Sequence, residues 1–585
     1  MTRQQNLMKA FLWFIATFIA LVLFWFFRIR GIHAEEQFSE ISTSAWMFHP
    51  HVINWFTAPF SLYRMDYPEW NTQYRSFIRP TECLHYYLLS LLFRYQYSAY
   101  LIGNYFYQAG TCAITYYIAA EILKLDRRLA NLFAFMVFVS PGYGQQQMFV
   151  IAYAVDPLAG FLTTASAAFF LRRRYVGAWI FLAFAVGAKE PAWPIPIAMA
   201  LFLLFALKDN LPRRLAISAA FLSPLVAMIA LRAYAFGWAG AFTSDAGGSS
   251  VQGKAAAGII EKLAEGLGKW PFGVLAHSQQ YSPQMLSIFK YWGFALDAVF
   301  WATLFSYAGL AAYRLLRSSS SVGNLRDKVR ELLDKFGFAE SATVVVAAGG
   351  LVFPLRFAGD PRYGAPAYPL LFLSLGIVLT LSARFWARTV AVSLLVSICI
   401  YGVVFRISDF THGREVFRAE WQLTAAYLRA IQSAGSHPLF VVDDATGGEI
   451  NSEALQKAYG PETKVVRVND LYKDRDCFIL PDSGDLPLHL AVTAQWTSTH
   501  SIHIHSEVTG CGGHNFLGVP RLPQGQLVRS DLGYRLSYTI DPRTSPQADM
   551  GERRTLDAVI DNAPPDTIVI APDLAHRSYQ IIPIS

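Results

Sequence analysis

The chain has 585 residues, of which 54% are hydrophobic and only 16% are charged, with a net charge of +7. A soluble domain carries about 25% charged residues. This composition, with repeated apolar runs of membrane-spanning length, therefore excludes an ordinary soluble protein and indicates a polytopic membrane protein. The positive charge requires no nucleic-acid partner, because cytoplasmic loops of membrane proteins are rich in Lys and Arg. None of the five cysteines forms a CxxC pair, which argues against a zinc ribbon or a dithiol redox site.

The apolar runs predict a mainly α-helical, polytopic bundle of about eleven transmembrane helices. The first run is longer than the apolar core of a cleaved signal peptide, and Arg28 and Arg30 follow it in place of a cleavage site. We therefore expect residues 1–28 to remain as the first transmembrane helix. The predicted spans are about 8–28, 98–122, 129–148, 150–171, 175–188, 191–207, 214–232, 288–313, 339–356, 364–383 and 387–405.

Three glutamates, Glu35, Glu36 and Glu40, follow the first span in the stretch AEEQFSEIS. Carboxylates at this place can form a solvated, negatively charged helix start, or they can supply a general base for a reaction at the membrane surface. Two aromatic-rich stretches of the same loop, 49–64 and 80–97, are amphipathic. We expect them to form short helices lying in the interface plane.

The charges of the loops predict the topology. With a cytoplasmic N-terminus, every cytoplasmic loop is basic, as in segments 124–128 and 172–174. This orientation places a first loop (29–97), a second loop (233–287) and the tail (406–585) on the outer side. We therefore expect a multi-pass inner (cytoplasmic) membrane protein whose C-terminal domain is periplasmic or extracellular.

Several ionisable residues break the charge rule, by which Lys and Arg are concentrated in cytoplasmic loops. Lys189 belongs near the outer ends of two spans, Arg356 and Arg362 flank the outer end of another, and Asp156 falls about two turns inside a span. Ionisable groups at membrane depth are costly, so each is a functional candidate by default. Each also has a purely structural interpretation. Asp156 can pair with Lys189, and Lys189 can extend to the lipid headgroups. Arg356 can anchor the helix at the interface, and Arg362 and Tyr363 can belong to a hydrogen-bonded turn.

Taken together, these residues predict a pocket at the outer membrane face, with carboxylates from the first loop and cations from later short loops. A guanidinium group matches the oxygens of a phosphate, and a carboxylate near a reacting hydroxyl suits general-base catalysis. These are the parts needed to transfer a sugar from a polyprenyl phosphate.

In these residues and in the motifs around them, the chain resembles the GT-C superfamily of integral-membrane glycosyltransferases, in particular the protein O-mannosyltransferases and aminoarabinose transferases. The stretch AEEQFSEIS is similar to the acidic motif after their first helix. Five further stretches resemble motifs of this superfamily, in the same order, over residues 8–405. They are FIRPTECLHYYLLSLLF, NYFYQAGTCAITYYIAAEIL, VDPLAGFLTTASAAFFL, GAKEPAWPIPIAMALFLLF and DPRYGAPAYPLLFLSLGIVL.

The resemblance implies an inverting transfer in which a first-loop carboxylate takes the proton of an acceptor hydroxyl. The usual base of the family is an Asp at the head of the motif, but Ala34 occupies that position here. Glu35 or Glu36 is then the base, and the sequence does not choose between them. The catalytic candidates are Glu35, Glu36 and Asp156. The substrate-binding candidates are Arg79, Lys189, Glu190, Arg356, Arg362 and Tyr363.

The implied partners are a polyprenyl-phosphate-linked sugar donor, a glycan, lipid or protein acceptor, and the membrane itself. The sequence leaves open which sugar is moved and whether a divalent metal is needed, and it indicates no other cofactor. An O-antigen-type polysaccharide polymerase or ligase is the alternative, although such enzymes usually place their large loop late in the chain. A transporter is disfavoured because no paired repeats are visible.

The tail, 406–585, differs in character from the transmembrane core, 98–405. Helix-like segments alternate with short β-branched runs such as LFVVDD and TIVIAPD, which predicts a small α/β domain outside the membrane. No catalytic signature occurs in this tail.

Two sequence features of the tail carry possible ligand or redox chemistry. His503 and His505 would share one face of a strand, and with Cys511 and His514 they are suitable metal ligands by type. Such histidines are more often plain surface residues. Cys477 and Cys511 would form a disulfide in an oxidising compartment.

Overall fold

A computed structural model describes most of the apolar core of the chain and part of its tail. It covers residues 3–23, 79–93, 100–143, 155–241, 267, 271–272, 291–306, 309, 336–356, 361–381, 389–390, 392–408, 434, 437, 439–442, 464–467, 489–509, 527–531, 534–540, 554–573 and 578–585. These residues divide into a helical unit and a unit made of strands.

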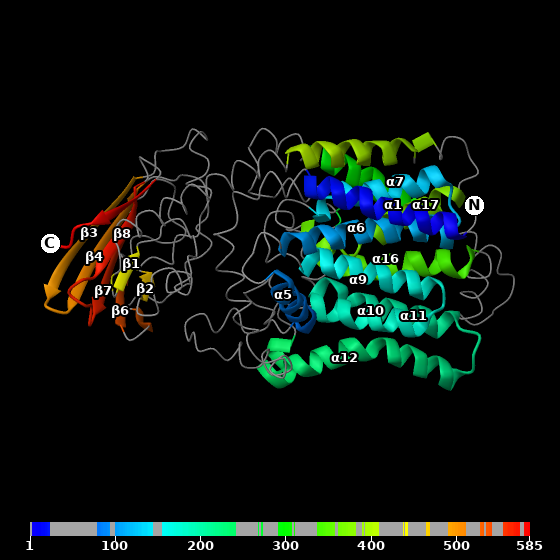
Figure 1. The fold of residues 1–585 in the computed structure, drawn as a ribbon. Helices are drawn as coiled ribbons and strands as arrows, with labels where there is room; N and C mark the ends of the chain where they lie inside the picture. The colour runs from blue at the N-terminus through cyan, green and yellow to red at the C-terminus, as the bar shows by residue number, and fades with distance from the viewer. Residues whose placement is uncertain are drawn as a thin grey trace. The chain divides into compact units, whose positions relative to one another are not determined.

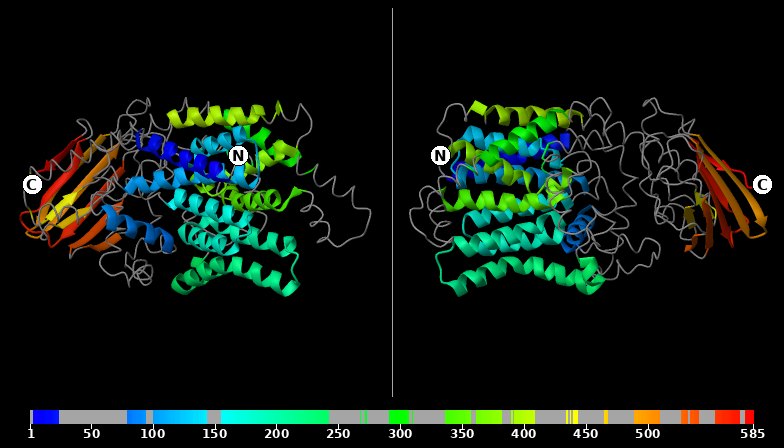
Figure 2. Two further views of the ribbon diagram at one scale, coloured as in Figure 1. Left: turned by 45° about the vertical axis from the view of Figure 1, so that its right-hand side comes forward. Right: turned by 180° about the vertical axis from the view of Figure 1, so that it is seen from behind.

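The helical unit is a bundle in which neighbours along the chain usually pack side by side (Figures 1 and 2). Helix α9 packs on α6 and α10, and α11 packs on α12 and α16. The helices are α1 (Arg3–Leu21), α5 (Pro80–Phe93), α6 (Leu101–Tyr117), α7 (Arg127–Phe138), α9 (Val155–Leu171), α10 (Tyr175–Ala188), α11 (Pro194–Ala206), α12 (Leu211–Ala241), 291–306, α16 (Phe338–Arg356), α17 (Tyr368–Leu381) and 392–408. Short turns η3 (Ile118–Ile122), η4 (Pro141–Tyr143), η6 (Glu190–Ala192) and η9 (Pro361–Gly364) join or extend them.

Each predicted span overlaps a helix of this unit. Two helical stretches, Leu211–Tyr234 and Phe338–Leu355, are long and apolar enough to cross a membrane, judged by length and composition alone. The remaining apolar helices of the described chain are shorter, for example Val155–Leu171. The expectation of a mainly helical chain with strands towards its C-terminus is confirmed, whereas the count of eleven spans and the domain boundaries stay predictions.

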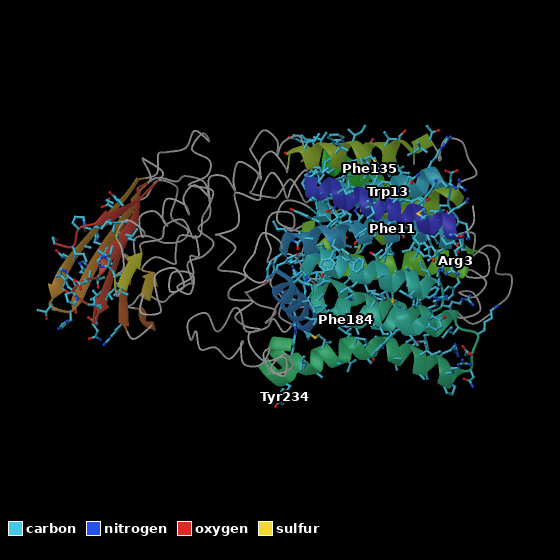
Figure 3. The ribbon with its side chains drawn as sticks, in the orientation of Figure 1. Arg3, Phe11, Trp13, Phe135, Phe184 and Tyr234 are labelled. Carbon is cyan, nitrogen blue, oxygen red and sulfur yellow. The ribbon has the colours of Figure 1, made fainter. Side chains whose placement is uncertain are left out.

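The outer faces of these helices are apolar. Phe11, Phe184 and Tyr234 project from the bundle surface (Figure 3), and these residues are 57%, 41% and 84% exposed. A helix that is apolar on its outer face as well as its inner face suits a lipid environment rather than water.

Small residues let the helices of the bundle approach closely. A Cβ atom added at Gly110 of α6 would lie 2.5 Å from the ring of Phe161 on α9. One added at Gly160 would lie 2.6 Å from the hydroxyl of Tyr143 and 3.0 Å from the carbonyl oxygen of Ala365. Close backbone approach of this kind increases van der Waals contact between helices and is common in membrane bundles.

Buried side chains satisfy backbone groups that helix geometry leaves open. The carbonyl oxygen of Phe138, at the end of α7, accepts hydrogen bonds from Arg406 Nε (3.1 Å), Arg406 Nη2 (2.9 Å) and Gln108 Nε2 (3.0 Å). The last carbonyl groups of a helix have no partner within it. Arg406 of the last helix therefore caps α7, and a cation there also complements the helix dipole.

The dipeptide Pro271–Phe272 is held in the bundle by three side chains. Asp297 Oδ1 accepts the N–H of Phe272 (2.8 Å), Tyr401 donates to the carbonyl of Phe272 (2.8 Å), and Tyr368 donates to that of Pro271 (2.6 Å). Proline has no N–H, so every backbone hydrogen-bonding group of the dipeptide has a partner.

The strands of the tail form two sheets. The first has the order β2-β1-β8-β9, with β1 parallel to both β2 and β8, and the second is antiparallel with the order β3-β4-β7-β6-β5. The strands are β1 (Leu439–Val442), β2 (Lys464–Arg467), β3 (His489–Ser498), β4 (Ser501–Thr509), β5 (Leu527–Asp531), β6 (Tyr534–Ile540), β7 (Arg554–Asp561), β8 (Ile568–Asp573) and β9 (Ser578–Ile582).

Both sheets contribute to one apolar core, which contains Leu439 and Val569 from the first sheet and Ile502, Ile504 and Ile560 from the second. The strand predictions for 439–442 and 568–573 are confirmed. The helix-like segment 415–435 lies outside the described residues except for residue 434, which is helical.

Pro224 interrupts the hydrogen bonds of α12 and generates the first prediction. Proline lacks the N–H that would bond the carbonyl oxygen of Ala220. That oxygen instead accepts from Ser223 Oγ (2.8 Å) and from Trp179 Nε1 of α10 (2.9 Å). Neighbouring helices and Ser side chains commonly satisfy such freed groups in membrane bundles.

We expect Trp179→Phe to lower the free energy of unfolding by about 0.5–1.5 kcal/mol, because one donor to Ala220 is lost. In a Pro224→Ala protein, the N–H of residue 224 can again bond the carbonyl oxygen of Ala220. Trp179→Phe should then lower the free energy of unfolding by less. Thermal unfolding of the four proteins in one detergent measures the coupling. Equal costs in both backgrounds would show that Trp179 does not act on the freed carbonyl.

Candidate functional site

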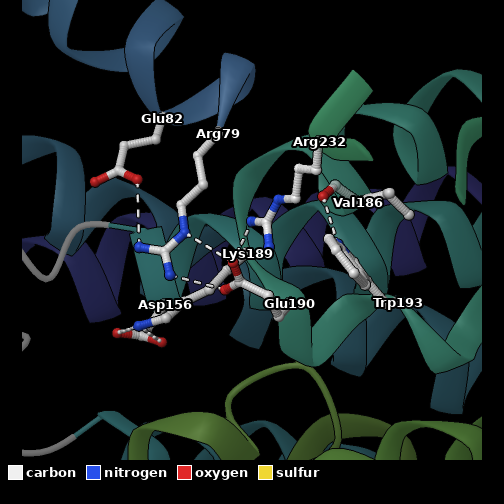
Figure 4. Close-up of polar contacts among 8 residues, drawn as sticks. All are labelled: Arg79, Glu82, Asp156, Val186, Lys189, Glu190, Trp193 and Arg232. Carbon is white, nitrogen blue, oxygen red and sulfur yellow. Dashed lines mark hydrogen bonds and ion pairs between the residues drawn. The ribbon is translucent and has the colours of Figure 1, made fainter. Parts of the chain in front are cut away.

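Five buried ionisable side chains lie where α5, α9, α10, η6 and α12 meet (Figure 4). All are less than a tenth exposed. They come from separate parts of the sequence: Arg79, Asp156, Lys189, Glu190 and Arg232. Burial of this much charge is costly unless each group has an opposite partner, and the contacts within the cluster supply such partners.

The corner between α10 and α11 places two of these residues. Helix α10 ends at Ala188, Lys189 is extended (φ −160°, ψ 151°), and Pro191 and Pro194 cannot continue the helical hydrogen bonds. Successive side chains point to opposite sides of extended backbone. Figure 4 accordingly shows Lys189 reaching towards Asp156 and Glu190 reaching towards two arginines.

The carboxylate of Glu190 lies between two guanidinium groups. Arg79 Nη2 is 2.8 Å from Oε2 and Arg79 Nε is 3.4 Å from Oε1, while Arg232 Nη2 pairs with Oε1 from the other side. The ring of Trp193 lies 4.6 Å from the guanidinium carbon of Arg232, and its indole N–H donates to the carbonyl of Val186 (3.1 Å). Both oxygens of Glu190 are therefore used in binding arginine.

Lys189 forms the second pair. Its Nζ atom lies 2.8 Å from Oδ1 and 2.9 Å from Oδ2 of Asp156, and both side chains are at most 2% exposed. Nζ also lies 5.3 Å from the centre of the Tyr363 ring, within the range of a cation–π contact. Through Lys189 the corner is thus joined to the start of α9 and to η9.

A third carboxylate belongs to the edge of the cluster. Glu82 lies 3.6 Å from Arg79 Nη1 and its side chain is 22% exposed. Among the described members, three cations thus face two fully buried carboxylates and this partly exposed one. The cluster is close to neutral as long as Glu82 stays beside Arg79.

Five of the residues that the sequence assigned to the site are in this cluster: Arg79, Asp156, Lys189, Glu190 and Tyr363. The backbone of Arg356 ends α16 and that of Arg362 lies in η9, but their side chains are outside the described part of the structure. Glu35, Glu36 and Glu40 also lie outside it. The pairing of Asp156 with Lys189 is the structural interpretation given above for Asp156, whereas Lys189 is buried in this pair and not extended towards headgroups.

Sequence reasoning missed Arg232 and Trp193. Arg232 sits at the predicted outer end of its span, so the charge rule that singled out Lys189 could have found it as well. No sequence signal identifies Trp193, because the ring acts only through a neighbour brought in by α12.

The tail histidines face a carboxylate. His503 Nε2 and His505 Nδ1 lie 3.1 Å and 2.7 Å from the same atom, Asp557 Oδ1. Within the described ranges, no three His, Cys, Asp or Glu side chains converge in a way that could hold a metal ion. Cys477, Cys511 and His514 are outside those ranges, so the disulfide stays a prediction.

The Asp156–Lys189 pair generates the second prediction. Lys189→Met keeps the length of the side chain but leaves a buried carboxylate without its cation, which should cost about 3–5 kcal/mol of stability. Combining it with Asp156→Leu removes both charges, and most of that cost should disappear. Thermal unfolding in detergent, followed by tryptophan fluorescence, compares the variants. If the double variant is as unstable as the sum of the single ones, the two groups are not coupled.

The solved structures similar to this chain include two of an archaeal oligosaccharyltransferase. The apo oligosaccharyltransferase of Archaeoglobus fulgidus has a TM-score of 0.39 and 13% identity, over 80% of this chain and 65% of that one. The archaeal oligosaccharyltransferase AglB from the same organism, in complex with an inhibitory peptide and a dolichol-phosphate, has a TM-score of 0.38 and 12% identity, over 79% and 65%. This chain thus spans about 65% of the length of either protein. No family model and no curated protein matches the sequence.

Proposed function

We propose that the protein transfers a sugar from a polyprenyl-phosphate-linked donor to an acceptor hydroxyl at the extracytoplasmic face of the membrane. The observation that carries the proposal is the convergence of Arg79, Asp156, Lys189, Glu190 and Tyr363 in one buried cluster. These residues were singled out from four separate stretches of sequence by their resemblance to GT-C motifs or by their charge. The charge rule assigns this end of the bundle to the outer face.

The arginines that follow α16 are the proposed donor clamp. Within the described contacts, the charges of Arg79, Lys189 and Arg232 are directed at carboxylates. Arg356 and Arg362 are the further cations that the sequence places at this end, and Tyr363, next to Arg362, lies against Lys189. The Asp156–Lys189 pair would then hold η9 in place, so that Arg362 can meet the phosphate of the donor.

The proposed reaction inverts the anomeric centre. Glu35 or Glu36 takes the proton of the acceptor hydroxyl as its oxygen attacks the anomeric carbon, and the bond from that carbon to the phosphate oxygen breaks. Polyprenyl phosphate leaves with the bonding electrons, and its lipid chain stays in the bilayer. In support, the predicted first loop (29–97), which contains both glutamates, also contains Arg79, a member of the cluster.

The clamp generates the third prediction. Arg356→Lys and Arg362→Lys keep the charge but lose the two-pronged fork that matches phosphate oxygens. At one position or both, we expect donor affinity to fall about tenfold or more, because hydrogen bonds to charged groups contribute about 1.5–3 kcal/mol. Binding of a radiolabelled polyprenyl-phosphate sugar to purified protein measures it. Normal binding and turnover in both Arg→Ala variants would remove the clamp.

The base generates the fourth prediction, which also tests the function. At either Glu35 or Glu36, Glu→Gln should lower the transfer rate about 10²–10⁴-fold, because Gln can hydrogen-bond the hydroxyl but cannot take its proton. Donor binding should change little. Glu40→Gln is the matched control and should stay within a few-fold of wild type.

The assay supplies purified protein with sugars on polyprenyl monophosphate and, separately, with oligosaccharides on polyprenyl diphosphate, and it follows label moving to acceptors. Wild-type rates in both Glu→Gln variants would rule out the first-loop base and leave Asp156 as the next candidate. Use of the diphosphate donors alone would point to a polysaccharide polymerase or ligase instead.

A further inference from the structure

Helix α5 is docked on the bundle by three contacts along its first half. Arg79, directly before the helix, binds Glu190. Thr81, in the first turn, contacts Gly187 of α10, and His85, one turn later, hydrogen-bonds Tyr107 of α6 through Nδ1 (2.8 Å). The helix belongs to the predicted first loop (29–97), so these contacts hold this part of the loop against the bundle.

Two glycines make the docking surface close-fitting. A Cβ atom on Gly187 would lie 2.7 Å from Thr81 Oγ1, and one on Gly103 would lie 2.9 Å from His85 Cε1. Close packing of small residues lets two helices approach but gives little attraction by itself once lipid is the alternative neighbour. Of the three contacts, only the one between Arg79 and Glu190 joins opposite charges, and it has two hydrogen bonds. Hydrogen bonds of this charged, paired kind are the strongest.

Arg232 binds the same carboxylate of Glu190 as Arg79 does, from the side of α12. It binds Glu190 Oε1 and is 1% exposed on its side chain, so the carboxylate is held against α12 before Arg79 approaches. A fixed acceptor loses less freedom when the second guanidinium binds. The arrangement is asymmetric: Arg232 holds Glu190 to the bundle, and Arg79 holds α5 to Glu190.

We propose that Arg79 is a positioning residue: its pairing with Glu190 docks α5 on the bundle, and the transfer reaction depends on this docking. This inference rests on the proposed function, because it gives the first loop the catalytic base. It assigns Arg79 a role other than contact with the donor. Arg79→Met should then lower the transfer rate with little change in donor affinity, since a misplacement of about 1 Å can cost about 10²-fold in rate.

The structure offers a way to restore the docking without Arg79. A Cβ atom on Gly187 lies 3.7 Å from the Cβ atom of Thr81, and disulfides have a mean Cβ–Cβ distance of about 3.8 Å. The T81C/G187C pair should therefore form a disulfide when copper phenanthroline oxidises the two thiols, and it should lock α5 onto α10. Cys83→Ser in all variants removes a neighbouring thiol of α5.

The experiment compares the T81C/G187C pair with and without Arg79→Met. Arg79→Met leaves the Arg232–Glu190 pair intact, so no buried charge loses its last partner. We expect the disulfide to form more slowly with Arg79→Met, and transfer, reduced about 10–100-fold before oxidation, to recover to within a few-fold after it. Donor binding should stay within about threefold throughout, since the donor keeps its own contacts.

Two matched controls accompany these variants. Leu92→Ala shortens a side chain of α5 that is 72% exposed and lies outside the cluster, so disulfide formation and transfer should stay near wild type. Arg232→Met leaves the Arg79–Glu190 pair and should slow the disulfide less than Arg79→Met does.

Three results would overturn the inference. Disulfide formation that is unaffected by Arg79→Met would show that the residue does not dock α5. A transfer rate that stays low after the disulfide has formed, or a large loss of donor affinity, would assign Arg79 to the substrate. Failure of the proposed function looks different: wild-type protein would show no transfer with any donor, while the disulfide rates would still report whether Arg79 docks α5.

Discussion

The need to neutralise buried charge governs the candidate site. In a medium of low dielectric constant, an unpaired ion costs several kcal/mol, so each charged side chain must find an opposite partner at hydrogen-bond distance. Glu190 meets this requirement for two arginines at once, and Asp156 meets it for Lys189. One corner of the chain, Lys189 and Glu190, thereby fixes elements that are far apart in sequence, from α5 to η9. Such a cluster tolerates the removal of a whole pair better than the removal of one member.

The same requirement extends to the backbone. Carbonyl oxygens freed by Pro224, by the end of α7 and by the Pro271–Phe272 segment are each satisfied by side chains from other helices. These contacts cross the bundle, so they fix the rotation and depth of each helix as well as its presence. A site built on helices held in this way can keep its ionised groups in one geometry, which a phosphate-binding or proton-transfer site needs.

The sequence predicted the helices, several members of the cluster and, as one reading, the pair of Asp156 with Lys189, but not the pairing of two arginines with Glu190. Long apolar runs identify helices well, and Asp156 and Lys189 were noticed because charge at membrane depth is rare. Which carboxylate meets which cation depends on the rotation of each helix, and an evenly apolar helix such as α10 gives no periodic signal for it. Arg79 and Glu190 are 111 positions apart, and only the fold brings them together.

In the tail as well, the sequence predicted individual elements but not how they pair. The β-branched runs predicted strands correctly at 439–442 and 568–573, but not that these two would be parallel neighbours in the middle of a sheet. Strand order depends on connections and on packing between sheets, which local sequence does not encode. His503 and His505 share a face of β4, because side chains two positions apart in a strand point to the same side. Their common partner, Asp557, lies on β7, more than 50 residues away in sequence.

The cap that Arg406 forms on α7 has a consequence for how the protein is made. The arginine and the carbonyl group it binds are 268 positions apart. At synthesis rates of about 5–20 residues per second, roughly 13–54 s pass between the two. During that interval the end of α7 must rely on Gln108, on water or on the insertion machinery. The described bundle thus gains this cap only with helix 392–408, and a chain interrupted before residue 406 would keep the hydrogen bond from Gln108 but lose both hydrogen bonds from Arg406.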